Sequence, residues 1–239
     1  MRKVLGALRR ADERFNLIAD GDRIAVGLSG GKDSMLLLYA LVLYKLFSKK
    51  QYDLHAVCVD LGFGGYNTPE IRAFAEKHAV PFHLVQTQIA EIVFDIRKEK
   101  NPCSLCAKMR KGALYEKVVH IGCNKAAFAH HADDMIETFV MSLMYEARVN
   151  TFSPKTFLSR RNVTLVRPFV LLREDDIRRA VQANGIPIAK NPCPIDRATK
   201  RDQAKEVIRY LNSLHKGTDE NIFTAIYNTD TYNLWNKEF

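Results

Sequence analysis

The sequence lacks any apolar run long enough to cross a membrane. The run Met35–Leu43 has nine residues, whereas a membrane helix needs about 20. A secretory signal is missing as well, because Met1–Arg14 carries charges throughout and has no apolar core followed by a small-residue cleavage site. We therefore expect a cytoplasmic protein with no membrane partner.

Cysteine is scarce, with five residues in 239. Thiols stay reduced in the cytoplasm, so a disulfide framework is not expected. Cys58 lies within the apolar run His55–Val59, and Cys123 lies at the end of an expected helix. Both are expected to be small buried residues rather than ligands. The other three, Cys103, Cys106 and Cys193, are candidates for chemistry.

Internal repeats, low-complexity segments and long linkers are also missing, which limits the number of domains. We expect residues 1–215 to form one nucleotide-binding domain with the cysteine site. Residues 216–239 are expected to form a C-terminal helical extension.

Negative charge is in short supply, since the formal net charge is +9. The segment from residue 148 to residue 205 carries thirteen Lys and Arg residues against five Asp and Glu residues. Such an excess suits a polyanionic partner, and nucleic acid is the commonest one. A solvated basic surface without a partner explains the charge equally well.

Short apolar segments alternate with amphipathic ones along most of the chain. Strands are expected at Arg23–Leu28, His55–Asp60, Phe82–Thr87, Lys125–Ala129 and Val163–Phe169. Helices are expected at Met1–Ile18, Ser34–Phe47, Pro69–His78, Leu105–Ile121, Ala132–Tyr145, Glu174–Ala183, Thr199–Leu214 and Asn221–Trp235. This alternation indicates an α/β fold of Rossmann-like type, with a parallel sheet and helices on both faces. Ligands of such sheets bind at the carboxyl ends of the strands.

A phosphate-binding loop is expected between the first strand and the next helix. The sequence there is Ser29-Gly30-Gly31-Lys32-Asp33-Ser34. The glycines allow main-chain N–H groups to converge on an anion at the helix N-terminus, while Lys32 and two hydroxyls complete the cradle. The loop is not a Walker A motif, because Val26 and Asp33 stand where that motif needs Gly and Ser or Thr. Kinase-type transfer is thereby disfavoured, and a glycine-rich turn without a ligand is the alternative.

The three remaining cysteines could support several kinds of site. Cys103-Ser104-Leu105-Cys106 opens a helix, and Cys193 lies in Asn191-Pro192-Cys193-Pro194. A CxxC pair at a helix start could be a redox pair. It could also be half of a zinc site, with His130 or His131 as a further ligand. Three thiolates without a fourth also suit an iron–sulfur cluster with one open iron. The residues alone leave these alternatives open.

The loop S-G-G-K-D-S resembles the signature of the PP-loop ATP pyrophosphatases, which cleave ATP between the α- and β-phosphates. Three further blocks resemble the tRNA 2-thiocytidine synthetase group: C-S-L-C-A-K-M-R-K-G, A-H-H-A-D-D-M-I-E-T and V-R-P-F-V-L-L-R-E-D-D-I. The likeness runs from about Arg14 to Lys205. Enzymes of that group replace the C2 oxygen of an anticodon-loop cytidine with sulfur.

The resemblance implies cofactors, partners and site residues for this chain. A four-iron four-sulfur (4Fe–4S) cluster would be held by Cys103, Cys106 and Cys193. These cysteines, Lys32 and Asp33 would be catalytic. ATP and Mg²⁺ would be bound by Ser29, Gly30, Gly31, Lys32, Asp33, Ser34, His130, Asp133 and Asp134. Asp60, at the end of the second expected strand, is a further candidate neighbour of the adenosine, with an ordinary strand-end residue as the equal alternative. Partners would be tRNA, a sulfur donor such as a cysteine desulfurase or free sulfide, and a second copy of the chain in a homodimer. For Asp133 and Asp134 the alternative is ordinary stabilisation of a helix N-terminus.

The chain also departs from the group. The later cysteine motif, usually a second CxxC, is Cys193-Pro194-Ile195-Asp196 here. Because the resemblance places only the first cysteine of that motif on the cluster, the three-ligand site is kept. The departure leaves room for another tRNA base or a small sulfur compound as substrate. The three cysteines disfavour the lysine-adding branch of the superfamily. A non-enzymatic sensor that binds ATP or an iron–sulfur cluster and nucleic acid is a further alternative.

Overall fold

The computed structural model describes residues 1–64, 68–98, 102–189, 193 and 200–228. The chain forms two compact units. The first contains Met1–His131 and Ser153–Ile195, and the second contains Ala132–Phe152 and Asp196–Phe239. These units divide the chain elsewhere than at residue 215, and the domain boundary expected there stays a prediction.

The first unit is built on a six-stranded sheet with the order β3-β2-β1-β4-β6-β5. The pairs β1–β2, β2–β3, β1–β4 and β4–β6 are parallel, which confirms the predicted Rossmann-like α/β fold. The edge pair β5–β6 is antiparallel, and β5 was not predicted. The strands are β1 (Asp22–Leu28), β2 (Tyr52–Asp60), β3 (Phe82–Gln86), β4 (Lys125–Ala127), β5 (Lys155–Leu158) and β6 (Val163–Val166).

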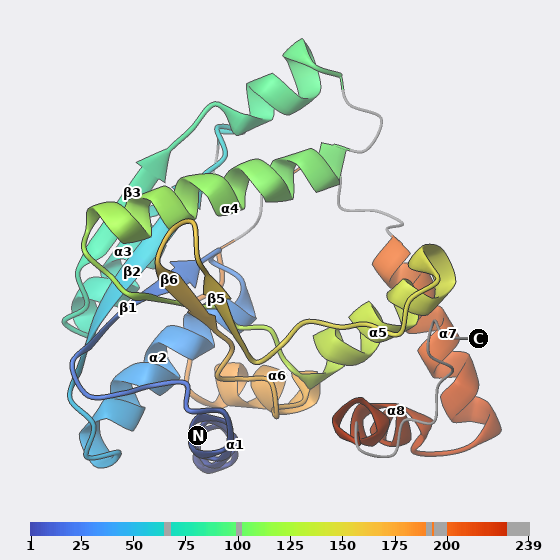
Figure 1. Cartoon of the computed structure of the whole chain (residues 1–239). Helices are drawn as coiled ribbons and strands as arrows, with labels where there is room; N and C mark the ends of the chain where they lie inside the picture. Colours follow the sequence, from blue (N-terminus) through green and yellow to red (C-terminus); the bar gives the residue numbers. More distant parts are fainter. Residues whose placement is uncertain (65–67, 99–101, 190–192, 194–199, 229–239) are drawn as a thin grey trace. The chain divides into compact units, whose positions relative to one another are not determined.

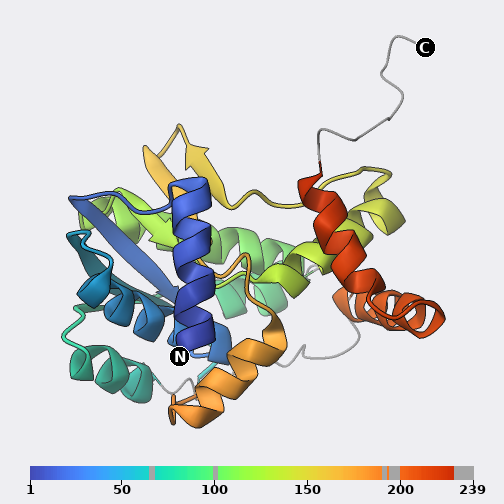
Figure 2. The ribbon, with the colours of Figure 1, turned by 90° about the horizontal axis from the view of Figure 1, so that it is seen from below.

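Helices cover both faces of this sheet (Figures 1 and 2). One face is covered by α4 (Pro102–His120) and by a short π-helix, η1 (Glu91–Ile96), which was not predicted. The other face is covered by α2 (Lys32–Phe47) and α3 (Thr68–Lys77), with α1 (Arg2–Phe15) and α6 (Glu174–Ala183) packed on α2.

The two cysteines that were expected to be structural are part of these cores. Cys123 belongs to the apolar cluster between α4 and the sheet, together with Val57 and Val59 of β2. Since side chains alternate along a strand, Cys58 projects from the opposite face, where it is fully buried. The expectation that Cys58 and Cys123 are small buried residues is confirmed.

The order of the strands defines where a ligand can bind. From β1 the chain moves outward to β2 and β3, and it then returns to the other side of β1 with β4. The carboxyl ends of β1 and β4 therefore lie side by side at a topological switch point, the place where ligands of such sheets bind. The loop Ser29–Ser34 follows β1.

The second unit consists of α5 (Ala132–Glu146), α7 (Lys200–Leu214) and α8 (Thr218–Tyr227). The last helix was predicted at Asn221–Trp235. It begins earlier because Gly217, with φ of 89°, turns the chain directly before it. The predicted end at Trp235 lies outside the described residues. No helix in the described ranges is long and apolar enough to cross a membrane.

Candidate nucleotide and cysteine site

The loop after β1 has the form of an anion cradle. Gly31 precedes α2 in an extended conformation, and the first main-chain hydrogen bond of the helix runs from Met35 N–H to Gly31 O (3.1 Å). The N–H groups of the residues before Met35, in the first helical turn, have no acceptor within the helix. They are therefore available to an anion. The Ser34 hydroxyl accepts from Ser29 N–H (3.1 Å) and donates to Gly31 O (3.0 Å). The serine hydroxyl thus holds the turn in the shape that directs the N–H groups outward.

Gly30 is required by the geometry of this turn. Its φ is 72°, a conformation that residues with a Cβ rarely adopt. A Cβ at this position would lie 2.8 Å from the Ala189 Cβ and 2.9 Å from the Ile71 Cδ1. The Gly30 carbonyl also accepts a hydrogen bond from Ala189 N–H (3.0 Å). The phosphate loop is therefore fastened to the segment that leads from α6 toward Cys193.

Lys32 begins α2 between two carboxylates. Its Nζ lies 2.9 Å from Glu174 Oε1 and 3.1 Å from Asp33 Oδ2. Burial lowers the pKa of Lys32, but the hydrogen bonds and charges of Glu174 and Asp33 outweigh it, and the pKa is raised on balance. The other carboxylate oxygen of Asp33, Oδ1, is buried without a hydrogen-bond partner among the described residues. A buried acceptor of this kind beside a phosphate cradle suits a magnesium ion, which prefers oxygen ligands.

Two further predicted residues of the first unit follow strands that neighbour β1. Asp60 ends β2, and its Oδ1 accepts from Gly62 N–H (2.9 Å). His130 follows β4, half-buried, with its ring 5.9 Å from that of Phe128. Because β2 and β4 flank β1, both residues lie at the same edge of the sheet as the phosphate loop.

Asp133 and Asp134 belong to the second unit, in the first turn of α5. Asp134 Oδ1 accepts from Arg201 Nη1 of α7 (2.6 Å). The same guanidinium and Lys205 approach Glu137, which is buried (3.6 Å each). Asp134 thus helps to join α5 to α7, and the metal-binding role of Asp133 and Asp134 stays a prediction.

All three candidate cysteines belong to the first unit. Pro102 opens α4, a position that suits proline, and places Cys103 and Cys106 three residues apart on one side of the first turn. Burial raises the pKa of the Cys106 thiol, and the charges of Cys193 and Cys103 raise it further, against a lowering by Arg110. The thiol of Cys193 is therefore close enough to Cys106 to influence its ionisation, although 87 positions separate them.

The electrostatic influence of Cys193 and Cys103 on Cys106 does not amount to a complete set of metal ligands. In the parts of the chain that the structure describes, no three His, Cys, Asp or Glu side chains are arranged to hold a metal ion. The donor set itself suits iron and sulfide, since thiolates are the usual ligands of iron–sulfur clusters. Cys193 lies four residues after Ala189. A chain of four residues spans about 14 Å at most. The hydrogen bond between Ala189 and Gly30 therefore keeps the cysteine site close to the phosphate loop.

Known proteins resemble this chain over nearly its whole length. A PP-loop domain family matches residues 7–210. A tRNA-cytidine(32) 2-sulfurtransferase of Syntrophotalea carbinolica is 36% identical over 213 residues, covering 89% of this chain and 82% of that protein. The protein of the same name from Geobacter metallireducens is 31% identical over 240 residues, covering 99% and 93%. The chain belongs to the PP-loop family, in the tRNA-cytidine(32) 2-sulfurtransferase group.

Two solved structures share the fold. The U34-tRNA thiolase NcsA from Methanococcus maripaludis, solved with its 4Fe–4S cluster, superposes with a TM-score of 0.77 at 22% identity, over 99% of this chain and 80% of that one. The NH₃-dependent NAD synthetase of Campylobacter jejuni superposes with a TM-score of 0.53 at 13% identity, over 100% and 98%. At these identities the likeness shows the fold alone.

The sequence interpretation of this PP-loop chain missed Glu174. It lies in the block V-R-P-F-V-L-L-R-E-D-D-I, to which no role was assigned. In the structure α6 packs on α2, and this brings Glu174 to the Nζ of Lys32. A carboxylate in a block that resembles the family was the available signal.

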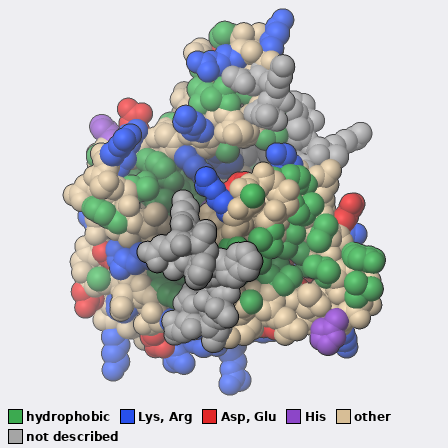
Figure 3. Space-filling model, turned by 45° about the vertical axis from the view of Figure 1, so that its right-hand side comes forward, with side chains coloured by type: hydrophobic (Ala, Val, Ile, Leu, Met, Phe, Trp, Pro, Cys, Tyr) green, Lys and Arg blue, Asp and Glu red, His purple; other side chains and the backbone are tan. Residues whose placement is uncertain are grey.

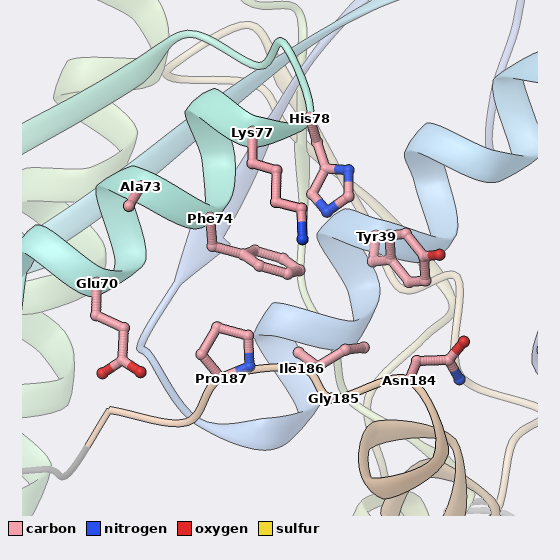
Figure 4. A pocket seen from close by; sticks show the side chains of 10 residues that line it. All are labelled: Tyr39, Glu70, Ala73, Phe74, Lys77, His78, Asn184, Gly185, Ile186 and Pro187. Atoms are coloured by element: carbon pink, nitrogen blue, oxygen red, sulfur yellow. The ribbon is translucent and has the colours of Figure 1, made fainter.

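A separate pocket of about 350 Å³ lies between α2, α3 and the segment after α6 (Figure 4). Tyr39, Phe74 and His78 form its aromatic wall, with ring centroids 4.8–6.4 Å apart. The opposite wall is the turn from Asn184 to Pro187. None of the predicted site residues lines this pocket, which belongs to the helix layer and not to the carboxyl edge of the sheet.

Proposed function

We propose that this protein is an ATP-dependent tRNA sulfurtransferase that replaces the C2 oxygen of cytidine 32 with sulfur. The observation that carries the proposal is the pairing of a phosphate loop with three thiols on adjoining segments. Gly30 of the loop bonds to Ala189, four residues before Cys193, and Cys193 influences the ionisation of Cys106. The proposed substrate, cytidine 32 of tRNA, is taken from the names of the relatives.

ATP activates the substrate oxygen in this proposal. The C2 oxygen attacks the α-phosphorus, pyrophosphate leaves, and the adenylated oxygen later departs as AMP. The N–H groups at the start of α2 bind the β- and γ-phosphates, and Lys32 neutralises the charge that develops on the leaving pyrophosphate. Asp33 would hold Mg²⁺, which draws charge from the phosphate oxygens when it is bound. Asp60 and His130 would border the adenosine at the same carboxyl edge of the sheet.

Cys103, Cys106 and Cys193 would hold a 4Fe–4S cluster. When bound, this cluster would supply an iron with an open coordination position, at which sulfide can be delivered to C2. The protein's own contribution is to fix three thiolates from two segments beside the phosphate loop, so that activation and sulfur delivery share one location.

The basic surface supports tRNA as the partner. Lys and Arg side chains are spread over the face shown in Figure 3, where Asp and Glu side chains are few. Arg160 and Arg161 lie exposed at the turn between β5 and β6. Positive side chains of this kind contact the phosphate backbone of RNA.

We also propose a homodimer in the cytoplasm, supplied with sulfur by a cysteine desulfurase or by free sulfide. Large apolar side chains are exposed on the second unit, and such surfaces mark interaction sites. They are Leu143, Met144, Tyr145, Val149, Tyr210 and Leu214.

The proposal is tested with protein purified without oxygen and supplied with tRNA, ATP, Mg²⁺ and sulfide. We expect AMP and pyrophosphate rather than ADP, stimulation by tRNA, and 2-thiocytidine in the digested tRNA. Thiolated uridine would instead support the second candidate, another tRNA base, which is favoured by the missing second cysteine after Cys193. Formation of ADP, or ATP turnover that tRNA leaves unchanged, would contradict both.

A further inference from the structure

The first turn of α6 presents three consecutive carboxylates with different surroundings. Asp175 is 76% exposed and lies 3.5 Å from Arg178. Asp176 is buried and bonds to Lys3 (2.8 Å). Glu174 is 26% exposed, and its Oε1 lies 2.9 Å from the Nζ of Lys32. Acidic residues stabilise any helix N-terminus, but that effect does not require contact with the phosphate-loop lysine.

The contact creates a conflict with nucleotide binding. Lys32 has to approach the phosphates of ATP, which carry several negative charges. Glu174 holds the same Nζ, and at 26–27% exposure the pair is only partly screened by water. A polyphosphate that enters the loop therefore competes with the Glu174 carboxylate for one cation.

Glu174 has a second cation within reach. The Nη2 of Arg178, one turn later on α6, lies 3.5 Å from the same Oε1 that contacts Lys32. The carboxylate can release Lys32 and keep a positive neighbour, so the exchange does not strand a charge. The Arg178 side chain is 64% exposed and can follow the carboxylate.

We propose that Glu174 is the exchangeable counterion of Lys32, which holds the lysine until the phosphates of ATP displace the carboxylate toward Arg178. Glu174 is thus a positioning residue that acts through Lys32 and sets the affinity of the loop for ATP. This inference rests on the proposed function, because it requires that the loop binds ATP.

The test compares ATP affinities by calorimetry in four proteins: wild type, Glu174→Gln, Glu174→Asp and Asp175→Asn. Removing the competing charge in Glu174→Gln should tighten ATP binding about three- to tenfold. Glu174→Asp keeps the charge and should stay near wild type. Asp175→Asn removes the same charge one residue away without touching Lys32, and should change the affinity less than about twofold. Circular dichroism checks that each variant is folded.

A second comparison isolates the role of Lys32. In a Lys32→Ala background, measured at higher ATP concentrations, Glu174→Gln should no longer tighten binding, because the cation for which the two anions compete is gone. The inference is overturned if Glu174→Gln behaves like Asp175→Asn, if it weakens ATP binding, or if its gain persists without Lys32. If wild-type protein binds no ATP, the proposed function itself fails, and the inference with it.

Discussion

At the scale of single residues, the proposed chemistry depends strongly on Lys32, which neutralises the charge on the leaving pyrophosphate. It begins the helix whose N–H groups face the phosphates, and no other Lys or Arg is part of the loop Ser29–Ser34. Its charge is secured by two carboxylates at 2.9 and 3.1 Å. The loop therefore depends on one flexible cation whose position other residues control.

Lys32→Ala should lower the rate of pyrophosphate release about 100-fold or more, because preorganised charge is lost from the leaving phosphates. The fold should remain, since the side chain is partly exposed at 27%. Pyrophosphate release in the presence of tRNA is the measurement. Lys45→Ala, in the last turn of the same helix, is the matched control and should keep wild-type activity. Near wild-type AMP production by Lys32→Ala would contradict the assignment of the loop.

The five cysteines should separate into two groups. Cys103→Ala, Cys106→Ala and Cys193→Ala should each abolish the visible absorbance of anaerobically purified protein and its thiolation activity, with ATP binding retained. Cys58→Ala and Cys123→Ala should keep both, because these side chains are packed in the cores. Burial raises the pKa of Cys123 to about 11, so it remains a neutral thiol near pH 7.

Iron, zinc and sulfide contents of the same preparations decide the kind of site. The cluster predicts about four irons and four sulfides per chain in the wild type. One zinc without iron would contradict the cluster and indicate a structural metal site.

At the scale of elements, the loop between β1 and α2 makes two demands on the residue at position 30. The residue must adopt a positive φ, and it must leave the place of a Cβ empty. Gly30 satisfies the two requirements together, because its φ is 72° and a Cβ there would meet neighbours at 2.8 and 2.9 Å. Gly21, before β1, satisfies only the first, with φ of 78° and nothing within 4 Å of the place a Cβ would take.

This difference gives a matched pair of variants. Gly21→Ala should lower the free energy of unfolding by about 1–2 kcal/mol through backbone strain alone. Gly30→Ala should add about 1–3 kcal/mol of overpacking against Ala189 and Ile71, and should also weaken ATP binding. Urea unfolding monitored by circular dichroism measures both. Equal losses in the two variants would show that the contact with Ala189 is not tight.

The elements differ in how far the sequence predicts them. The five strands from β1 to β4 and β6 were predictable because each is a short apolar run followed by a turn or an amphipathic helix. The strand β5 has four residues at the sheet edge, with Lys155 and Phe157 exposed, and so short an alternation is too weak a signal. The π-helix η1 lies in a charged stretch and buries only Val93. Its local sequence does not show the core that it joins.

The residues of the candidate site also differ in how far the sequence predicts them. The loop Ser29–Ser34 and the cysteine pair are local patterns, and the sequence predicts them as such. The closeness of Cys193 to Cys106 and of Glu174 to Lys32 depends on tertiary packing between distant segments. The pairing of Asp134 with Arg201 also arises only when α7 packs on α5. Contacts of this range leave no periodic signal in the sequence.

At the scale of the whole molecule, the net charge of +9 governs encounter with a polyanion. The excess concentrates between residues 148 and 205, a segment that also contains Glu174 and Cys193. Catalysis on tRNA requires the RNA backbone to be held while one base reaches the activated nucleotide. A basic segment that includes parts of the site serves that requirement without any sequence-specific contact.

Binding of tRNA should therefore weaken steeply as salt rises, in proportion to the number of phosphates that Lys and Arg neutralise. Arg160→Glu with Arg161→Glu should lower tRNA affinity at least about tenfold near 0.1 M salt and reduce the salt dependence, while ATP affinity stays unchanged. Arg72→Glu with Lys77→Glu, exposed on α3, makes the same change of charge and should have a smaller effect. Filter binding over a series of salt concentrations measures each. Long-range attraction depends on net charge, whereas direct contact depends on position. Equal losses of tRNA affinity in the two double variants would therefore show that the basic segment attracts RNA only through net charge, without direct contact at Arg160 and Arg161. A tRNA affinity that does not change with salt concentration would show that the protein does not bind the RNA phosphates. That result would favour a small sulfur compound as the substrate.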